Sequence, residues 1–412
     1  MKLKKTVCSV FLISSLFCSS AFALNNSDLD TIPGGFSRSP EWFAGPEAEV
    51  DYVIPTDAFY QGSNPEGSPI RASLGIAFKG GFRFNPDTKE GMLYKGLYQG
   101  VGVGLKTFMH QELMGKPAMF YVFQGAPFHH FGSRFHLGYE WKFGVAVGWH
   151  HEQVTANDGF AHTLSTAITA HMGIALKMSY DLTDRWSLAL ALEGIHHSNG
   201  NTSWRNAGLN AAGLSLGVSY IFNPQLQTIS TSPELTEEAD RKKWFIDVMG
   251  FGAWRQRIIH IDPCEAIPNP APSYLIPGKY AVAGVQVAPT ISLNRWVAVG
   301  PAFDLIWDKS NALQAHWIEM PWEEGMYFTP VSFKEQISAG ISAHAELTTP
   351  IFAVNAGIGY NFINPKGDIA FYQSLTVKTF LTKNLYLNFG YRLAGFKDPH
   401  HLMLGVGYRF RL

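Results

Sequence analysis

Three residue types that can together hydrolyse an ester lie close together near the middle of the chain. The segment 193–200 reads Glu-Gly-Ile-His-His-Ser-Asn-Gly, and an asparagine follows at position 210. A serine becomes a strong nucleophile when a histidine takes its proton, and a third group must hold the imidazole in the right tautomer. His196, Ser198 and Asn210 supply these types, which predicts a serine hydrolase with this catalytic triad.

An alternation of residue types predicts that the three side chains share one face of two neighbouring β-strands. The even positions of 186–192 are all large and apolar, and His196 and Ser198 continue that phase. On the returning strand Asn210 is in phase with Leu214. Alternate residues of a strand share a face and lie about 7 Å apart. We therefore expect His196 to reach the Ser198 hydroxyl, and Asn210 to reach the other ring nitrogen.

The same alternation recurs along most of the chain and predicts an all-β fold. The opposite face of these strands carries glycine, alanine and serine, as in the 213–219 segment, which suits the inside of a narrow closed barrel. Aromatic residues at strand ends fit the girdles of a transmembrane barrel. The expected strands number about sixteen: 46–54, 68–83, 97–110, 116–125, 133–150, 164–181, 185–198, 209–222, 243–253, 279–291, 296–308, 335–348, 351–362, 369–381, 385–396 and 401–410.

Composition supports a membrane location. Of the 412 residues 46% are hydrophobic, 14% aromatic and only 16% charged, with a net charge of −1. Low charge and abundant aromatics argue against disorder, and the lack of a basic excess argues against nucleic acid as a partner. After the N-terminal segment no apolar run of 18 residues occurs, so we expect strands rather than helices to span the membrane.

The chain divides into four expected parts. Residues 1–23 combine lysines, a short apolar stretch and Ala-Phe-Ala, which predicts a signal peptide. Residues 24–222 form the first barrel, and 243–412 form a second, non-catalytic half. The polar, proline-containing 223–242 segment reads as a linker. Related motifs in both halves indicate a duplication, and we expect two tandem eight-stranded barrels, with one sixteen-stranded barrel as the alternative.

Connection lengths predict which end of the first barrel faces outward. Bacterial barrels place short turns in the periplasm and long loops outside. The turn at 182–184 is short, whereas the connections 55–67 and 151–163 are long. Strand 185–198 therefore runs outward and carries the triad to the outer rim. The 84–96 connection is long where this scheme expects a short one.

No metal or other cofactor is predicted. His129-His130 and His150-His151 could suggest metal ligands, but neighbouring strand residues point to opposite faces, so such pairs rarely bind one ion together. In the second half no serine accompanies His400 and His401. We therefore expect that half to be structural or accessory.

The 193–222 segment resembles the lipid A 3-O-deacylase (PagL) family. The likeness covers the first half, about 40–222, and rests on His196-x-Ser198-Asn199-Gly200 followed by Asn206-Ala-Gly-Leu. It implies an eight-stranded outer-membrane barrel in which His196 is the base and Ser198 the nucleophile. It also implies an oxyanion hole near Asn199, Gly200 and Asn206. The backbone amides after Ser198 and the Asn206 side chain suit that task on chemical grounds as well.

The chain departs from this family at one position. The family has its glutamate twelve residues after the serine, where this chain has Asn210. The His-x-Ser-Asn-Gly motif with that asparagine also resembles outer-membrane phospholipase A, which is a twelve-stranded barrel that uses calcium.

These observations predict an outer-membrane serine esterase that removes an acyl chain from lipid A. Its partner would be lipopolysaccharide in the outer leaflet. Two alternatives stay open, which are a phospholipase A-like enzyme with a Ser-His-Asn triad, and a non-enzymatic porin or structural barrel.

Overall fold

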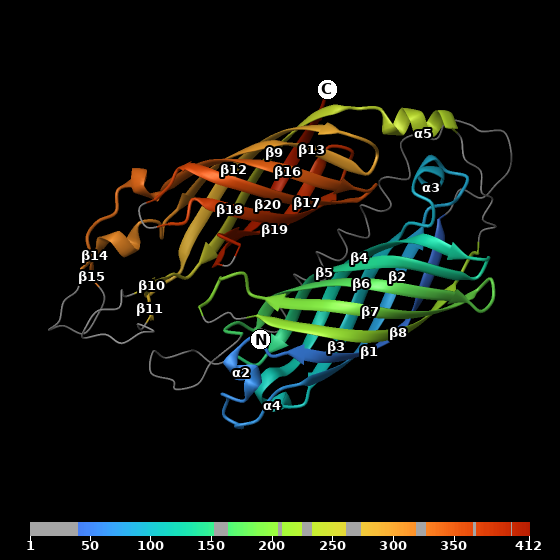
Figure 1. Ribbon diagram of the computed structural model, residues 1–412, viewed down its shortest axis with the longest axis horizontal. Coiled ribbons are helices and arrows are strands. Elements are labelled where there is room, and N and C mark those ends of the chain that lie inside the picture. Colours follow the sequence, from blue (N-terminus) through green and yellow to red (C-terminus); the bar gives the residue numbers. More distant parts are fainter. Residues whose placement is uncertain are drawn as a thin grey trace, which may run out of the picture. The chain divides into compact units, whose positions relative to one another are not determined.

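The computed structural model of the chain contains two closed antiparallel β-barrels of eight strands each (Figure 1). It describes residues 40–151, 164–204, 208–224, 233–260, 273–318, 327–365, 368–396 and 398–412. The expected signal peptide at 1–23 and Asn206 lie outside these ranges.

The first barrel is built from β1 to β8 in chain order. Its strands are β1 Glu41–Ile54, β2 Ala72–Arg83, β3 Tyr98–Phe108, β4 Gly115–Phe131, β5 Phe135–Trp149, β6 Ile168–Asp181, β7 Trp186–Ser198 and β8 Leu209–Ile221. The barrel closes because β1 pairs with both β2 and β8: Val50 lies opposite Leu74 on one side and Leu214 on the other. This closure confirms the prediction of two barrels, and the single sixteen-stranded barrel is wrong.

The second barrel closes in the same way. Its strands are β9 Trp244–Arg255, β12 Tyr280–Ser292, β13 Val297–Asp308, β16 Ile337–Thr348, β17 Phe352–Ile363, β18 Phe371–Phe380, β19 Leu385–Ala394 and β20 Asp398–Arg411. Phe251 of β9 lies opposite Gly284 of β12 and Gly405 of β20, so the first strand, β9, pairs with both the second and the last strand and closes the ring. Arg392, Asn388 and Arg409 of this barrel are buried.

Short elements lie in the connections. They are the helices α2 Ala58–Gln61, α3 Lys89–Leu93, α4 Gln111–Met114 and α5 Pro233–Asp240, the 3₁₀ turns η1 Leu313–His316 and η2 Phe333–Gln336, and the strands β10 Ile258–His260, β11 Ser273–Leu275, β14 Trp317–Ile318 and β15 Tyr327–Phe328. Among the helices in the described residues, none is long and apolar enough to cross a membrane.

The outer face of the first barrel is a band of exposed apolar side chains. Leu74, Ile76 and Phe78 alternate along β2 and are 55–64% exposed. At one rim the Trp186 and Tyr220 rings pack edge to face with centroids 5.0 Å apart, as expected for an interfacial aromatic girdle. A bilayer solvates such a surface, so the barrel is a transmembrane one.

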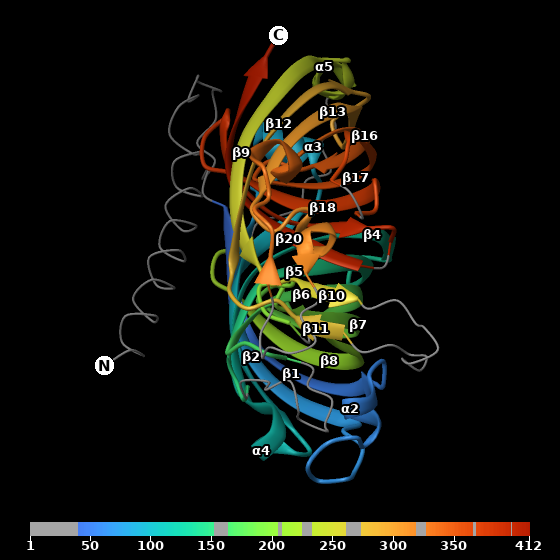
Figure 2. The same ribbon diagram turned by 90° about the vertical axis from the view of Figure 1, so that its left-hand side faces the viewer.

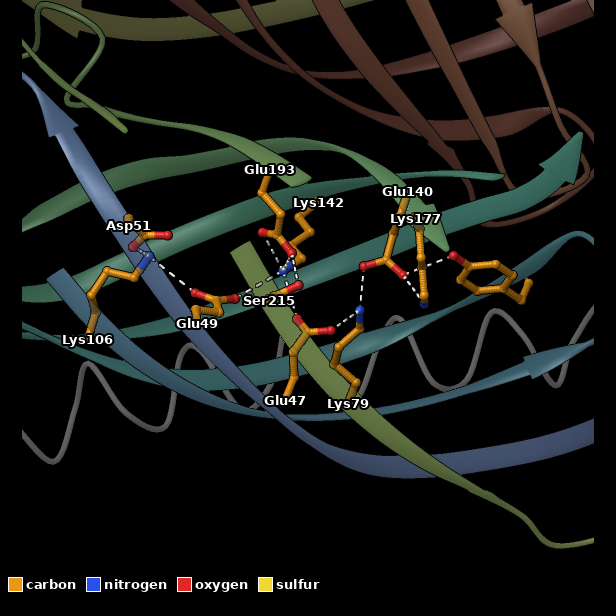
Figure 3. A network of polar contacts seen from close by, with 11 residues as sticks. Glu47, Glu49, Asp51, Lys79, Lys106, Glu140, Lys142, Lys177, Glu193 and Ser215 are labelled. Atoms are coloured by element: carbon orange, nitrogen blue, oxygen red, sulfur yellow. Dashed lines mark hydrogen bonds and ion pairs between the residues drawn. The ribbon is translucent and has the colours of Figure 1, made fainter. Parts of the chain in front are cut away.

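The inner face of the first barrel combines small and charged side chains. Most inward positions of β7 and β8 are small, and charged side chains fill the lumen, among them Glu193 of β7 and others from the remaining strands (Figure 3). At its centre, the Lys142 ammonium lies 2.9 Å from Glu47, 3.0 Å from Glu49 and 3.0 Å from Glu193. The small residues of β7 and β8 leave room for these longer chains, so a narrow barrel is compatible with a charged interior.

The two ends of the first barrel carry different helices. Figure 1 shows α2 and α4 at one end and α3 at the opposite end, and the turned view of Figure 2 again places α2 beside β1. Helix α3 occupies the long 84–97 connection, which is the exception noted in the sequence. The end with α2 is also where β7 finishes and β8 begins.

Candidate active site

Strand β7 places His196 and Ser198 on the outer face of the first barrel. Burial alternates along the last residues of this strand: Ile195 and His197 are buried in the lumen, whereas His196 and Ser198 are partly exposed on the outer side. This alternation follows from the two-residue repeat of a strand. The predicted phase of the two residues is therefore the one in the structure.

Asn210 lies directly opposite His196 in the pairing of β7 with β8. Its Oδ1 is 2.7 Å from His196 Nδ1. An amide oxygen can only accept a hydrogen bond, so in this arrangement Nδ1 carries the ring proton and Nε2 keeps its lone pair. That is the tautomer that a general base needs in order to take a proton from a serine.

Ser198 lies two residues beyond His196 on the same face. Its partner in the register on β6 is Ala170, a residue with a minimal side chain, and Met172 is the partner of His196. The serine is partly exposed toward the lipid side rather than toward the lumen. An acyl ester of a membrane lipid could approach it across the barrel surface without entering the barrel.

Two further residues shape the surroundings of His196: Gly208, which belongs to the Asn206-Ala-Gly-Leu motif, and Tyr60, which belongs to no motif in the sequence. Gly208 has φ +68°, and a Cβ built on it would lie 3.1 Å from His196 Cε1. The Tyr60 hydroxyl, which is fully buried, donates to the Gly208 carbonyl oxygen at 3.1 Å. No signal in the sequence links Tyr60 to this site, because 148 positions separate it from Gly208.

The residues expected around an oxyanion hole are only partly gathered by the structure. Asn199 is buried, and its Nδ2 donates to Ser165 Oγ at 3.1 Å. Gly200 and Asn201 follow with φ +63° and φ +61°, so the chain turns sharply just after Ser198. Asn206 lies outside the described residues.

Aromatic side chains inside the barrel pack against the end of β7 and fix its position. The buried His197 ring lies 5.0 Å from Trp149 and 4.8 Å from His171, measured between ring centroids. Because His196 and His197 are neighbours in a pleated strand, holding one ring in the lumen also holds the other on the outer face.

Within the described parts of the chain, two groups of side chains have the composition of a metal site. Glu47, Glu49 and Glu193 converge in the lumen, but the Lys142 ammonium already occupies the space between them. The other group is Glu66, His110 and Glu112 in the connections that carry α2 and α4. There the His110 ring is engaged by the Ser68 hydroxyl at 2.9 Å and by Glu112 at 3.4 Å. The histidine pairs at 129–130 and 150–151 belong to neither group.

The second barrel contains a serine–histidine–asparagine arrangement that the sequence analysis missed. Ser342 Oγ lies 2.7 Å from His344 Nε2, and Asn355 Oδ1 lies 2.6 Å from His344 Nδ1. All three side chains are buried inside the barrel, at 4–7% exposure. This group faces the lumen and is shielded from lipid.

Comparison with known proteins gives matches to two families. Residues 80–219 match the family described as "Lipid A 3-O-deacylase (PagL)", and residues 244–412 match "Acyloxyacyl hydrolase, C-terminal domain". Among curated proteins, none matches the chain.

Several solved barrels are similar to the chain at low identity. The outer membrane protein AlkL is 14% identical, with 49% of this chain and 98% of that one covered and a TM-score of 0.24. A porin of Rh. blastica is 10% identical over 91% of this chain and 99% of that one, with a TM-score of 0.16. The assignment of the fold therefore rests on the strand pairing described above. The two family matches together span most of the sequence: the first barrel is similar to the lipid A 3-O-deacylase (PagL) family, and the second barrel is similar to the acyloxyacyl hydrolase C-terminal domain.

Proposed function

We propose that the first barrel is an outer-membrane serine esterase that removes an ester-linked acyl chain from lipid A. The observation that carries this proposal is the 2.7 Å contact between His196 and Asn210 on the lipid-facing surface, two residues from Ser198. The match of residues 80–219 to the lipid A 3-O-deacylase family supports lipid A as the substrate. The long connections at this end of the barrel support its placement in the outer leaflet, where lipopolysaccharide lies.

In the proposed reaction, Ser198 attacks the ester carbonyl carbon while His196 Nε2 takes the hydroxyl proton. Asn210 Oδ1 stabilises the resulting imidazolium through the Nδ1–H bond. The proton then passes to the departing sugar hydroxyl, which leaves an acyl-serine. Water activated by the same histidine releases the fatty acid and regenerates Ser198.

The negative charge on the carbonyl oxygen needs nearby donors. The backbone N–H groups after Ser198, at Asn199 and Gly200, are our candidates, together with the side chains of Asn199 and Asn206. In the structure the Asn199 side-chain amide donates to Ser165, so it would have to exchange that partner for the carbonyl oxygen.

A phospholipid is the alternative substrate, because outer-membrane phospholipase A shares the residue pattern with asparagine as the third member of the triad. The interior argues against a porin, because the ion pairs around Lys142 and Glu140 fill the described lumen of the first barrel. No cofactor is required by the chemistry proposed.

Reconstituted protein can separate the two lipid substrates. Purified full-length chain would be given lipid A and, separately, phosphatidylethanolamine, with and without a calcium chelator, and the release of fatty acid would be measured. We expect release from lipid A that survives the chelator. Calcium-dependent release from the phospholipid alone would favour the phospholipase, and no release from either would favour a non-enzymatic barrel.

A further inference from the structure

A short segment at the end of the first barrel, residues 55–62, touches the candidate site at two points. Thr56 Oγ1 accepts a hydrogen bond from Asn210 Nδ2 at 3.2 Å. Tyr60, one turn later in α2, donates to the Gly208 carbonyl at 3.1 Å. Both contacts join the connection after β1 to the start of β8, on the side of the triad away from Ser198.

Local bonds give this segment a fixed shape. The Thr56 N–H donates to the Ile54 carbonyl at 2.8 Å, and the Asp57 side chain caps α2 by accepting from the Phe59 N–H at 2.9 Å. The Asn64 side chain then binds the Phe59 carbonyl at 2.8 Å. Because Tyr60 is fully buried, the segment is anchored in the barrel end rather than free in solvent.

The two possible orientations of the Asn210 amide have opposite consequences for the protonation of His196. With Oδ1 on His196 Nδ1, the imidazole keeps its lone pair on Nε2 and can act as a base. If the amide rotated by half a turn, its NH₂ would face Nδ1, the ring proton would move to Nε2, and that base would be blocked.

Thr56 opposes this rotation during the reaction. When His196 takes the serine proton, both ring nitrogens carry hydrogen and Nδ1–H must find an acceptor. A hydrogen bond from Nδ2 to Thr56 keeps the amide plane in place with Oδ1 toward the ring. The Thr56 hydroxyl could also donate to the oxygen of a rotated amide. The orientation is therefore set by Thr56 together with the positive charge on His196, which attracts Oδ1.

The Tyr60 contact acts on the other side of the imidazole. Gly208 backs the His196 ring so closely that a methyl group there would lie 3.1 Å from Cε1. The Tyr60 hydroxyl holds the carbonyl of that same glycine. The position of the ring against the β8 end therefore depends on α2.

We propose that residues 55–62 are a positioning element of the hydrolytic site, in which Thr56 orients the Asn210 amide and Tyr60 holds the Gly208 backbone behind His196. This inference rests on the proposed function. Neither residue touches the reacting atoms, so both act through the histidine.

The test for Thr56 uses kinetics of fatty acid release from lipid A in detergent with the full-length protein. Thr56→Val should lower kcat about fivefold, the equivalent of one neutral hydrogen bond, and leave KM unchanged. Thr56→Ser should keep most of the rate. In an Asn210→Asp background Thr56→Val should cost less than twofold, because a carboxylate presents an oxygen in either orientation.

Tyr60→Phe should lower kcat by a similar factor without changing KM. Tyr121→Phe is the matched control, because Tyr121 is also a buried tyrosine of this barrel but its hydroxyl has no hydrogen-bond partner within the described residues. That variant should leave the rate unchanged.

Several results would overturn the inference. They are equal effects of Thr56→Val and Thr56→Ser, an equal cost of Thr56→Val in both backgrounds, or equal rates for Tyr60→Phe and Tyr121→Phe. An inactive Asn210→Asp enzyme would also contradict it, since only an acceptor is required there. A parallel measurement on Ser198→Ala distinguishes failure of this inference from failure of the proposed function. If Ser198→Ala keeps its activity, the proposed function itself is refuted. If Ser198→Ala loses activity but the Thr56 and Tyr60 variants do not, only the positioning element is refuted.

Discussion

At the scale of single residues, the direction in which a histidine points separates the candidate site from a group with similar bonds. His344 binds Ser342 and Asn355 at 2.7 Å and 2.6 Å, yet all three lie in the lumen of the second barrel. His196 binds Asn210 at 2.7 Å on the surface that faces lipid. A membrane ester can reach only the arrangement at His196, so hydrogen-bond geometry alone does not identify an esterase.

Asn210 offers a test of the third member of the triad. We expect Asn210→Glu to keep substantial activity, because a carboxylate also accepts the Nδ1–H bond and is the residue that the family has at this place. Asn210→Leu removes the acceptor and should lower kcat far more. Rates of fatty acid release from lipid A would be compared for the two variants, and equal rates would show that Asn210 is not the partner of His196.

At the scale of elements, period-two alternation was sufficient to predict the strands and the shared face of His196, Ser198 and Asn210. Alternation is a local property, and the β7–β8 connection is short enough to bring the two strand ends together. The contributions of Thr56 and Tyr60 could not be predicted in this way. They depend on closure of the barrel between β1 and β8, which brings together residues about 150 positions apart.

Gly208 tests how closely the β8 end must fit against the histidine. Gly208→Ala adds a methyl group 3.0 Å from the His197 carbonyl oxygen and 3.1 Å from His196 Cε1, at φ +68°. We expect a loss of about 1–2 kcal/mol in stability from the left-handed backbone and at least a tenfold loss of activity.

Gly67 provides the matched control for this change. It has φ +61°, but a Cβ there meets nothing within 4 Å. Gly67→Ala should therefore show a similar loss of stability with normal activity. Equal activity of the two alanine variants would mean that the Gly208 contact does not matter to the site.

At the scale of the whole molecule, each barrel closes on itself and fills its lumen with charge. Most inward side chains of β7 and β8 are small, with Glu193 of β7 as the exception. The other charged side chains lie on earlier strands, where glutamates and lysines are dispersed through the sequence and do not form an obvious pattern. Only the closed ring shows that they converge on one another.

Lys142 tests this interior. Its ammonium is shared by three buried carboxylates, of which Glu193 has no other ion pair among the described residues, so Lys142→Met would leave a buried carboxylate uncompensated. We expect a loss of about 3–5 kcal/mol in the free energy of unfolding. Lys177→Met is the control and should cost much less, because Glu140 keeps its ion pair with Lys79. Urea unfolding of reconstituted protein would measure both, and equal losses would contradict the central role of Lys142.

The closure of β1 on β8 predicts that the first barrel is self-sufficient. Residues 24–224 expressed alone should fold into a membrane and release fatty acid from lipid A, because every strand of the ring and the candidate triad lie within that range. Folding would be measured by heat-modifiable mobility, which is the difference in migration on SDS gels between unheated and heated samples of a folded barrel. A fragment that only aggregates would show that the first barrel requires the second half.

The central claim is that Ser198 and His196 hydrolyse an ester of lipid A. The most direct measurement is mass spectrometry of lipid A from bacterial membranes that carry the wild-type chain, Ser198→Ala, His196→Ala or the lumenal control Ser342→Ala. We predict that wild type and the control yield lipid A lacking one acyl chain, whereas the two triad variants, folded and inserted, lose at least 10⁴-fold in rate and leave it intact. Deacylated lipid A from membranes carrying Ser198→Ala would contradict the account.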